Sequence, residues 1–215
     1  MDITWYGHSC FRITQRNYAT IVTDPYDAKT IGYSTLKLKA DVVTVSHDAP
    51  GHNFTDAVDT THVLAGPGEY EIGGVFILGE AMVDTDAEDP RYNIIYVIDF
   101  DGLTVARLGD LDHIPSQSAI DGLGQIDVAL VPVGGGGGLT ASQAAEVISL
   151  LEPSIVVPMH YKTDFTDLEF DSVERFLKEM GVSNIEDVEV IDTLKLTTRS
   201  SLPEGTQIVV LDAKE

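Results

Sequence analysis

The sequence predicts an α/β protein with mixed β-sheets, and two observations lead to this prediction. The first half of the chain contains short apolar or alternating runs that are typical of strands. The second half alternates strand-like apolar runs with amphipathic helical segments. Two sheets packed back to back with helices outside them suit this order of elements. No linker or low-complexity tract divides the chain, so we expect one domain over residues 1–215.

The strands of the first half follow one another closely. A polar turn at residues 15–17 separates two apolar runs and predicts a hairpin. Residues 42–45 (Val-Val-Thr-Val) are continuously apolar apart from one threonine, which is typical of a fully buried strand. The predicted strands are residues 3–6, 10–13, 19–23, 41–45, 62–65, 75–78, 93–99 and 104–108.

The second half predicts two strand–helix units and a closing strand. A helix begins after Thr140, a good N-cap, and presents Ala144, Val147, Ile148 and Leu151 on one face. Pro153 ends this helix, and Gly181 ends a second one over residues 171–180. The strands are predicted at residues 128–133, 155–159 and 206–211.

The composition restricts the classes of partner. With 35 acids against 13 bases the net charge is −22, which repels nucleic-acid phosphates, so we expect a small-molecule substrate and no nucleic acid. No run approaches the roughly 20 apolar residues that span a bilayer, and the first residues do not have the pattern of a signal peptide. We therefore expect a cytoplasmic protein that does not bind membranes. Cys10 is the only cysteine, so an intrachain disulfide is excluded, and the oligomeric state stays open.

Candidate metal ligands follow three of the predicted buried strands. His47 and His52 lie in the loop after residues 41–45, Asp110 follows residues 104–108, and His160 follows residues 155–159. Strand ends are where α/β folds place ligands, and imidazole with carboxylate suits zinc, manganese or iron. A single His or Asp after a strand is more often a loop residue bonded to backbone. The spacing alone therefore leaves the metal and structural interpretations evenly balanced.

Several motifs extend this pattern over nearly the whole chain. They are Gly7-His8-Ser9-Cys10-Phe11, Thr23-Asp24-Pro25, the loop from Val45 to Asn53, Gly66-Pro67-Gly68-Glu69-Tyr70-Glu71, Leu108-Gly109-Asp110, Val131-Pro132-Val133-Gly134-Gly135 and Val157-Pro158-Met159-His160-Tyr161-Lys162. In order and spacing the chain resembles the metallo-β-lactamase superfamily, specifically its small cytoplasmic branch related to ascorbate-phosphate lactonases and other zinc-dependent hydrolases. The resemblance implies a four-layered αββα sandwich with metal ions at one edge between the sheets.

The chain departs from the family's signature loop, His-x-His-x-Asp-His. His47 matches its first histidine and His52 its last, but Ala49 and Gly51 stand where the second histidine and the aspartate belong. A further family histidine usually follows the Gly-Glu-Tyr-Glu segment, where this chain offers only Asp84. The resemblance assigns Asp110 to the bridging carboxylate and His160 to the last histidine.

The resemblance therefore implies a reduced, degenerate metal site. His52, His160 and Asp110 would hold at most one divalent ion, with zinc expected first and manganese or iron as alternatives. His47 and Asp84 are further candidate ligands, and a chain without any metal is the rival interpretation.

The candidates for catalysis are His47, Asp48 and His8. The family aspartate that orients the attacking water is absent at Gly51, so Asp48 or Asp84 would have to take over its role. The resemblance places His8 at the pocket, and a hydrogen-bonded loop histidine is the equally weighted alternative.

Other residues are weaker candidates. His113 could lie behind the site, whereas Cys10 fits a small core residue better than a nucleophile. The five glycines at residues 134–138 lack the Lys-Ser/Thr of a phosphate-binding loop and fit a flexible loop at the edge of the pocket.

These observations predict a metal-dependent hydrolase of a small ester, lactone or phosphodiester. The alternative is a catalytically inactive family member that serves as a small-ligand or protein-binding scaffold. The metal content of the purified protein distinguishes the two.

Overall fold

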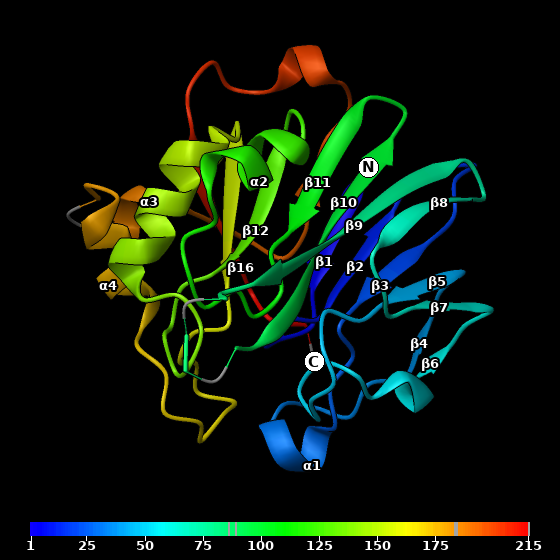
Figure 1. The fold of residues 1–215 in the computed structure, drawn as a ribbon, viewed down its shortest axis with the longest axis horizontal. Helices are drawn as coiled ribbons and strands as arrows, with labels where there is room; N and C mark the ends of the chain where they lie inside the picture. Colours follow the sequence, from blue (N-terminus) through cyan, green and yellow to red (C-terminus); the bar gives the residue numbers. More distant parts are fainter. Residues whose placement is uncertain (86, 89, 183–184, 215) are drawn as a thin grey trace.

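The strands of the computed structural model form two large sheets that pack face to face (Figure 1). The structure describes residues 1–85, 87–88, 90–182 and 185–214. The six-stranded sheet has the order β15-β1-β2-β3-β5-β7. Its strands are β1 (Asp2–Trp5), β2 (Phe11–Thr14), β3 (Ile21–Thr23), β5 (Val42–Thr44), β7 (His62–Leu64) and β15 (Leu194–Lys195).

The eight-stranded sheet has the order β14-β16-β13-β12-β11-β10-β9-β8. Its strands are β8 (Gly68–Ile72), β9 (Val75–Val83), β10 (Tyr92–Phe100), β11 (Leu103–Arg107), β12 (Val128–Pro132), β13 (Ile155–Met159), β14 (Glu189–Ile191) and β16 (Gln207–Leu211). A separate two-stranded sheet pairs β4 (Leu38–Lys39) with β6 (Val58–Asp59).

The helices cover the outer faces unequally. Figure 1 shows α2 (Gln117–Gly122), α3 (Ala141–Leu151) and α4 (Val173–Glu179) together on one flank, outside the eight-stranded sheet. On the other side the helical layer is reduced to α1 (Ala28–Ile31) and the segment that follows it. The remaining short helices are the 3₁₀ turns η1 (Thr55–Ala57), η2 (Ile185–Asp187) and η3 (Arg199–Ser201). The mixed α/β sandwich predicted from the sequence is thereby confirmed.

Helix α3 forms where its sequence predicts it. The Thr140 hydroxyl caps the backbone of Gln143, whose side chain accepts from the Thr140 backbone in return, a complete capping box. The face with Ala144, Val147 and Leu151 is buried against the sheet. Glu152 ends the helix in a left-handed conformation, immediately before Pro153.

Two groups of apolar side chains hold the layers together. The larger fills the space between the sheets and beneath α3 and α4, and it includes Trp5, Phe11 and Phe176. The smaller lies outside the six-stranded sheet, where Cys10 and Tyr26 pack under the segment around α1. Cys10 is a fully buried thiol, as expected from its apolar neighbours. Among the described residues, no helix combines the length and apolarity that crossing a membrane requires.

Parallel pairing determines where the strands end. Strands β3, β5 and β7 run parallel to one another, as do β11, β12, β13 and β16. Parallel neighbours deliver their carboxyl ends to the same edge of a sheet. Side chains that follow β3, β5, β11 and β13 are therefore brought to one edge of the sandwich.

Candidate metal centre

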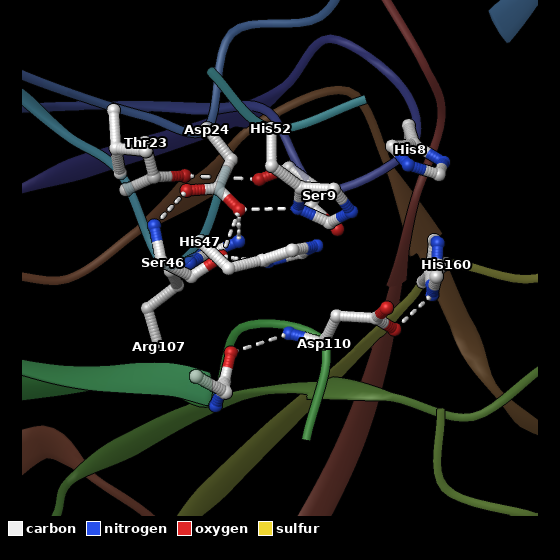
Figure 2. A network of polar contacts seen from close by, with 12 residues as sticks. His8, Ser9, Thr23, Asp24, Ser46, His47, His52, Arg107, Asp110 and His160 are labelled. Carbon is white, nitrogen blue, oxygen red and sulfur yellow. Dashed lines mark hydrogen bonds and ion pairs between the residues drawn. The ribbon is translucent and has the colours of Figure 1, made fainter. Parts of the chain in front are cut away.

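Five of the predicted site residues gather at this edge: His8, His47, His52, Asp110 and His160 (Figure 2). His47 lies just past β5, Asp110 just past β11 and His160 directly after β13. His8 enters from the turn between β1 and β2, and His52 from the loop after β5. Segments far apart in the chain thus contribute to one cluster.

Three of these histidines pack ring against ring. The ring centroid of His8 lies 4.9 Å from that of His52 and 4.2 Å from that of His160. One nitrogen from each of the three rings lies within 4.8 Å of the other two. The ring of His47 continues the cluster, 4.2 Å from that of His52. His8, His52 and His160 are almost completely buried, whereas His47 is half-buried.

Asp24 is a buried carboxylate that accepts hydrogen bonds from residues of the cluster and from residues packed against it. It accepts hydrogen bonds from the backbone nitrogen of Ser46 at 2.8 Å and from the hydroxyl of Ser46 at 2.6 Å. It also accepts from Nδ1 of His52 and from the guanidinium of Arg107. Asp24, His47 and His52 offer three potential ligand atoms near one another, but the carboxylate is already engaged. We therefore interpret Asp24 as the residue that positions His52.

These hydrogen bonds determine which ring nitrogens stay free. A carboxylate only accepts, so His52 donates its Nδ1 proton to Asp24 and keeps the lone pair on Nε2. Ser46 gives its hydroxyl proton to Asp24, so it accepts from Nδ1 of His47, 2.9 Å away. Both rings thus have the tautomer in which Nε2 can bind a cation or a proton.

Three buried polar atoms in the cluster make no hydrogen bond to any described residue. They are Nδ1 of His8, Nδ1 of His160 and Oδ1 of Asp110. The last two lie 3.2 Å apart, within ion-pair distance but outside hydrogen-bond geometry. Buried polar groups are nearly always satisfied, so unpaired ones that converge indicate a ligand. Imidazole nitrogens beside a carboxylate oxygen are a donor set that suits a divalent metal ion, so these residues fit such an ion.

The backbone at these residues is strained. His8, Asp24 and His160 have φ angles of 50°, 33° and 56°. This left-handed region is uncommon for residues other than glycine, and such strain concentrates at functional sites. The carbonyl of His8 accepts from Nε1 of Trp5 at 3.0 Å and from the backbone nitrogen of His160 at 3.2 Å. These bonds tie the two strained histidines together.

Burial favours the neutral form of His8, His47 and His52. Burial and the neighbouring His160 and His52 lower the pKa of His8 well below its usual value. Burial also lowers the pKa of His52, although Asp24 opposes it. The pKa of His47 falls to about 4, mainly through burial and then through His52. Neutral imidazole is the form that binds metal ions.

Asp110 is the carboxylate in front of the cluster. Burial alone would raise its pKa, but His160, His52 and Arg91 together lower that pKa below its usual range. Arg91 donates to Oδ2 of Asp110 and to the carbonyl of Gly137, and it lies 3.8 Å from Asp112. Arg91 thus neutralises one oxygen of Asp110, while Oδ1 faces His160.

A cavity of about 350 Å³ opens beside His47. Its lining includes Val45, Val63, Ala65 and Tyr92. Asp48 also lines it, is exposed and accepts from the side chain of Asn53. The volume is within the range of small-molecule sites.

The other candidates lie outside the cluster of ligand atoms. Asp84 follows the end of β9 and belongs to neither of the two groups of potential metal ligands found among the described residues. His113 pairs with Asp112 at 2.8 Å. His62 is an exposed residue at the start of β7.

Sequence reasoning assigned no role to Asp24, Arg107 or Arg91. Asp24 directly follows a predicted strand, which is the signal that identified His47, Asp110 and His160. Arg107 is a lone base in an otherwise apolar strand, a pattern that indicates a buried ion pair. Arg91 lies in a polar stretch and offered no comparable signal.

The clustered histidines and carboxylates agree with the proteins to which this chain is similar in sequence. The family described as "Beta-lactamase superfamily domain" matches residues 2–160. A UPF0173 protein of Pyrococcus furiosus is 32% identical over 187 residues, covering 76% of this chain and 84% of that protein. A UPF0173 metal-dependent hydrolase of Archaeoglobus fulgidus is 27% identical, covering 89% and 95%.

Solved structures extend the likeness to three dimensions. A protein of Thermotoga maritima, assigned as a Zn-dependent hydrolase of the metallo-beta-lactamase superfamily, is 34% identical with a TM-score of 0.78, covering 98% of this chain and 97% of that one. Igni18, a metallo hydrolase of Ignicoccus hospitalis, shares the fold with a TM-score of 0.69 at 21% identity, covering 91% and 99%. The closer relation to ascorbate-phosphate lactonases stays a prediction. By sequence and by fold, this chain belongs to the metallo-β-lactamase superfamily.

Proposed function

We propose that this protein is a metal-dependent hydrolase of a small ester or lactone, with one divalent ion held by His52, His160 and Asp110. The observation that carries the proposal is the pair of buried, unsatisfied atoms Nδ1 of His160 and Oδ1 of Asp110, 3.2 Å apart. The ring centroid of His52 lies 5.6 Å from that of His160. Relatives named metal-dependent hydrolases support it.

The chain's own residues supply the rest of the chemistry. A divalent ion at such a site supplies Lewis acidity, which lowers the pKa of water and polarises a substrate oxygen. His47 is half-buried, lines the cavity and lies beside His52, so it is the group that can move a proton between the cavity and the site. Its Nδ1 is held by Ser46, which leaves Nε2 to accept that proton.

The cavity favours a neutral substrate. Its described lining combines apolar side chains with the carboxylate of Asp48 and contains no lysine or arginine. An anionic phosphodiester would meet a like charge there, whereas the acyl part of an ester or lactone would contact Val45 and Ala65. The net charge of −22 acts in the same direction.

Arg91 supports a stoichiometry of one ion. Its guanidinium donates a hydrogen bond to Oδ2 of Asp110. A second cation that shared this carboxylate would need the same oxygen. Ala49 offers no ligand atom in the loop beside it. We propose zinc as the ion, since three nitrogen or oxygen ligands with an open position suit catalytic zinc.

The first test measures metal and activity together. Protein purified without chelator should contain at most one tightly held ion per chain by elemental analysis. It should cleave a chromogenic carboxylic ester or a lactone at least 10-fold faster than a chromogenic phosphodiester, measured as kcat/KM. His52→Ala and His160→Ala should abolish both metal and turnover, whereas the surface control His62→Gln should leave both unchanged.

A variant of His47 tests its proposed role in proton transfer separately from metal binding. His47→Gln should keep the metal but lower kcat on the order of 100-fold, because proton transfer is lost. Two ions per chain would refute the one-metal site. A protein that is folded and binds no metal would instead support the non-catalytic scaffold.

A further inference from the structure

The inner face of the eight-stranded sheet extends beyond the six-stranded sheet near the candidate site. Residues two positions apart in a strand lie on the same face, so Tyr92 shares a face of β10 with Tyr96. The Tyr96 hydroxyl donates to the carbonyl of Leu64 at 2.9 Å, so this face is turned toward the six-stranded sheet. Tyr96 is completely buried, whereas Tyr92 is 48% exposed. The six-stranded sheet therefore covers β10 at Tyr96 but no longer at Tyr92.

Strand β9 changes from buried to exposed at the same level. Gly79 is the direct partner of Tyr96 on β9, and Val83 is the direct partner of Tyr92. Directly opposed residues of neighbouring strands place their side chains on one face, in contact with each other. Gly79 is buried, but Val83 is 38% exposed. Val83 and Tyr92 thus form an apolar patch on an inner face that the other sheet leaves uncovered.

This apolar patch is continuous with the cavity beside His47. Tyr92 belongs to the patch and also lines the cavity of about 350 Å³, together with Val45, Val63 and Ala65. Val63 comes from β7, the edge strand of the six-stranded sheet, so both sheets contribute apolar walls. An extended apolar group that starts at His47 would contact Val63 and Tyr92 and then continue onto the patch.

The exposure of these side chains distinguishes them from the rest of the surface. Among the described residues, seven large apolar side chains are exposed, and three of them are Val63, Val83 and Tyr92. Single exposed apolar residues are ordinary, whereas adjoining ones next to a cavity indicate a binding surface. The described lining of the cavity contains no lysine or arginine and includes the carboxylate of Asp48. The surface therefore fits a neutral apolar group better than an anionic one.

We propose that the cavity and the apolar patch bind the acyl chain of the substrate, and that the enzyme selects medium-chain acyl esters or lactones over acetyl esters. The proposal rests on the proposed metal-dependent function and names the part of the substrate that the cavity recognises. Water adds to the acyl carbon, the bond from that carbon to the alcohol oxygen breaks, and the alcohol leaves with a proton. The acid formed ionises at neutral pH, so Asp48 favours its release.

The first test is the chain-length profile of the metal-loaded protein. The p-nitrophenyl esters of acetate, butyrate, hexanoate and octanoate share one leaving group, and each is used at concentrations where it is monomeric. After subtraction of spontaneous hydrolysis, kcat/KM should rise about 2–4-fold for each added methylene, because each methylene is removed from water. The rise should appear mainly in KM, since the chain is bound equally in the substrate and in the transition state.

Matched variants locate the binding surface. Val63→Ser and Tyr92→Ser should each lower the ratio of octanoate to acetate kcat/KM by about 10-fold, a loss typical of a hydrophobic pocket that loses contact with its ligand. The controls are Val190→Ser and Phe76→Ser. The side chains of Val190 and Phe76 are 46% and 45% exposed and do not line this cavity. Both controls should leave the ratio unchanged.

A binding measurement without turnover keeps the inference separate from the hydrolase activity. N-Phenyl-1-naphthylamine is a neutral apolar fluorophore that brightens when it leaves water. It should bind wild-type protein with or without a metal chelator, and 1-octanol should displace it. Val63→Ser and Tyr92→Ser should weaken this binding, and Val190→Ser should not.

The outcomes distinguish the inference from the proposed function. If wild-type protein cleaves acetate and octanoate esters equally well, the hydrolase function stands and the acyl-chain site is wrong. A profile that rises as steeply in Val63→Ser and Tyr92→Ser as in wild type also overturns the site. Binding of the fluorophore that Tyr92→Ser weakens, without turnover of any ester, would overturn the hydrolase function and support the apolar site. A dimer that Tyr92→Ser converts to a monomer, without fluorophore binding, would assign the patch to a second copy of the chain and overturn the inference.

Discussion

Asp24 and Arg107 form a fully buried ion pair directly behind the histidine cluster. Removing two charges from water costs several kcal/mol per ion, which close contact and further hydrogen bonds must offset. Asp24 obtains those bonds from Ser46 and His52, whereas Nε and Nη1 of Arg107 make none with described residues. Among the described residues, Asp24 alone therefore offsets the cost of burying the Arg107 charge. The pair connects the stability of the fold to the orientation of a candidate ligand.

This dependence predicts the effect of Asp24→Asn. The amide leaves the Arg107 charge buried and unpaired, which should destabilise the metal-free protein by about 3–5 kcal/mol in urea denaturation. Asparagine tolerates the left-handed φ of this position, so backbone strain does not account for the loss. The double variant Asp24→Asn, Arg107→Met removes the unpaired charge, so its free energy of unfolding should fall less than that of the single variant. A single variant within 1 kcal/mol of wild type would contradict this account.

The elements around the site show how glycines position its ligands. Gly109 follows β11 with φ of 73°, and a Cβ there would lie 2.1 Å from Oδ1 of Asn93. That oxygen accepts from the backbone nitrogen of Asp110 at 3.0 Å, while Nδ2 of Asn93 donates to the carbonyl of Leu108 at 2.9 Å. Strand β10 therefore holds the end of β11 through one buried amide. Asp110 is placed by its neighbours in the sheet.

Gly124 provides a matched control for this arrangement. Its φ of 72° is nearly that of Gly109, but a Cβ there would meet nothing within 4 Å. Gly124→Ala should cost only the left-handed strain, about 1–2 kcal/mol. Gly109→Ala should cost about 1–3 kcal/mol more, because it displaces Asn93 from buried hydrogen bonds. Zinc affinity should fall for Gly109→Ala but not for Gly124→Ala. Equal losses in thermal unfolding and unchanged zinc binding would show that Asn93 does not position Asp110.

The same elements show how far the sequence alone could predict the structure. The buried strands β5, β12 and β13 were predicted because apolar runs bounded by turn residues are a local signal. Residues after strands were correctly expected to lie together, since parallel strands share an edge. The edge strands β14 and β15, of three and two residues, and the four-residue α1 are too short to show such a run and were not predicted.

The details of the site depend on contacts between distant residues. Asp24 meets Arg107 across 83 positions of sequence, and the ring of His8 lies against Gly51. Such contacts follow from register and sheet packing, which no local pattern records. The absence of a carboxylate at Gly51 and a place for His8 at the pocket were both predicted, whereas the contact of the His8 ring with Gly51 was not.

For the whole molecule, the acidic surface and the buried histidines respond to pH in opposite directions. The net charge of −22 means that surface carboxylates repel one another at neutral pH. Lowering the pH reduces this repulsion and favours the folded state. The folded state keeps His8, His47 and His52 neutral, and its pKa for each of them lies below the usual value. The unfolded chain takes up those protons near its ordinary histidine pKa of about 6.5.

Salt separates the two effects and gives the last prediction. At 1 M NaCl the Debye length is about 3 Å, so surface repulsion is screened, whereas the buried histidines are affected much less. The stability of the metal-free protein should then be fully present above about pH 6.5. It should fall as the pH is lowered from there through about 4, the folded-state pKa of His47. At low salt the relief of carboxylate repulsion should flatten this decline. His47→Gln should reduce the slope at 1 M NaCl and His62→Gln should not, as measured by urea denaturation at each pH. A wild-type stability that stays constant or rises between pH 6.5 and 4 at high salt would mean that the folded cluster takes up protons as readily as the unfolded chain, which would contradict the lowered histidine pKa values.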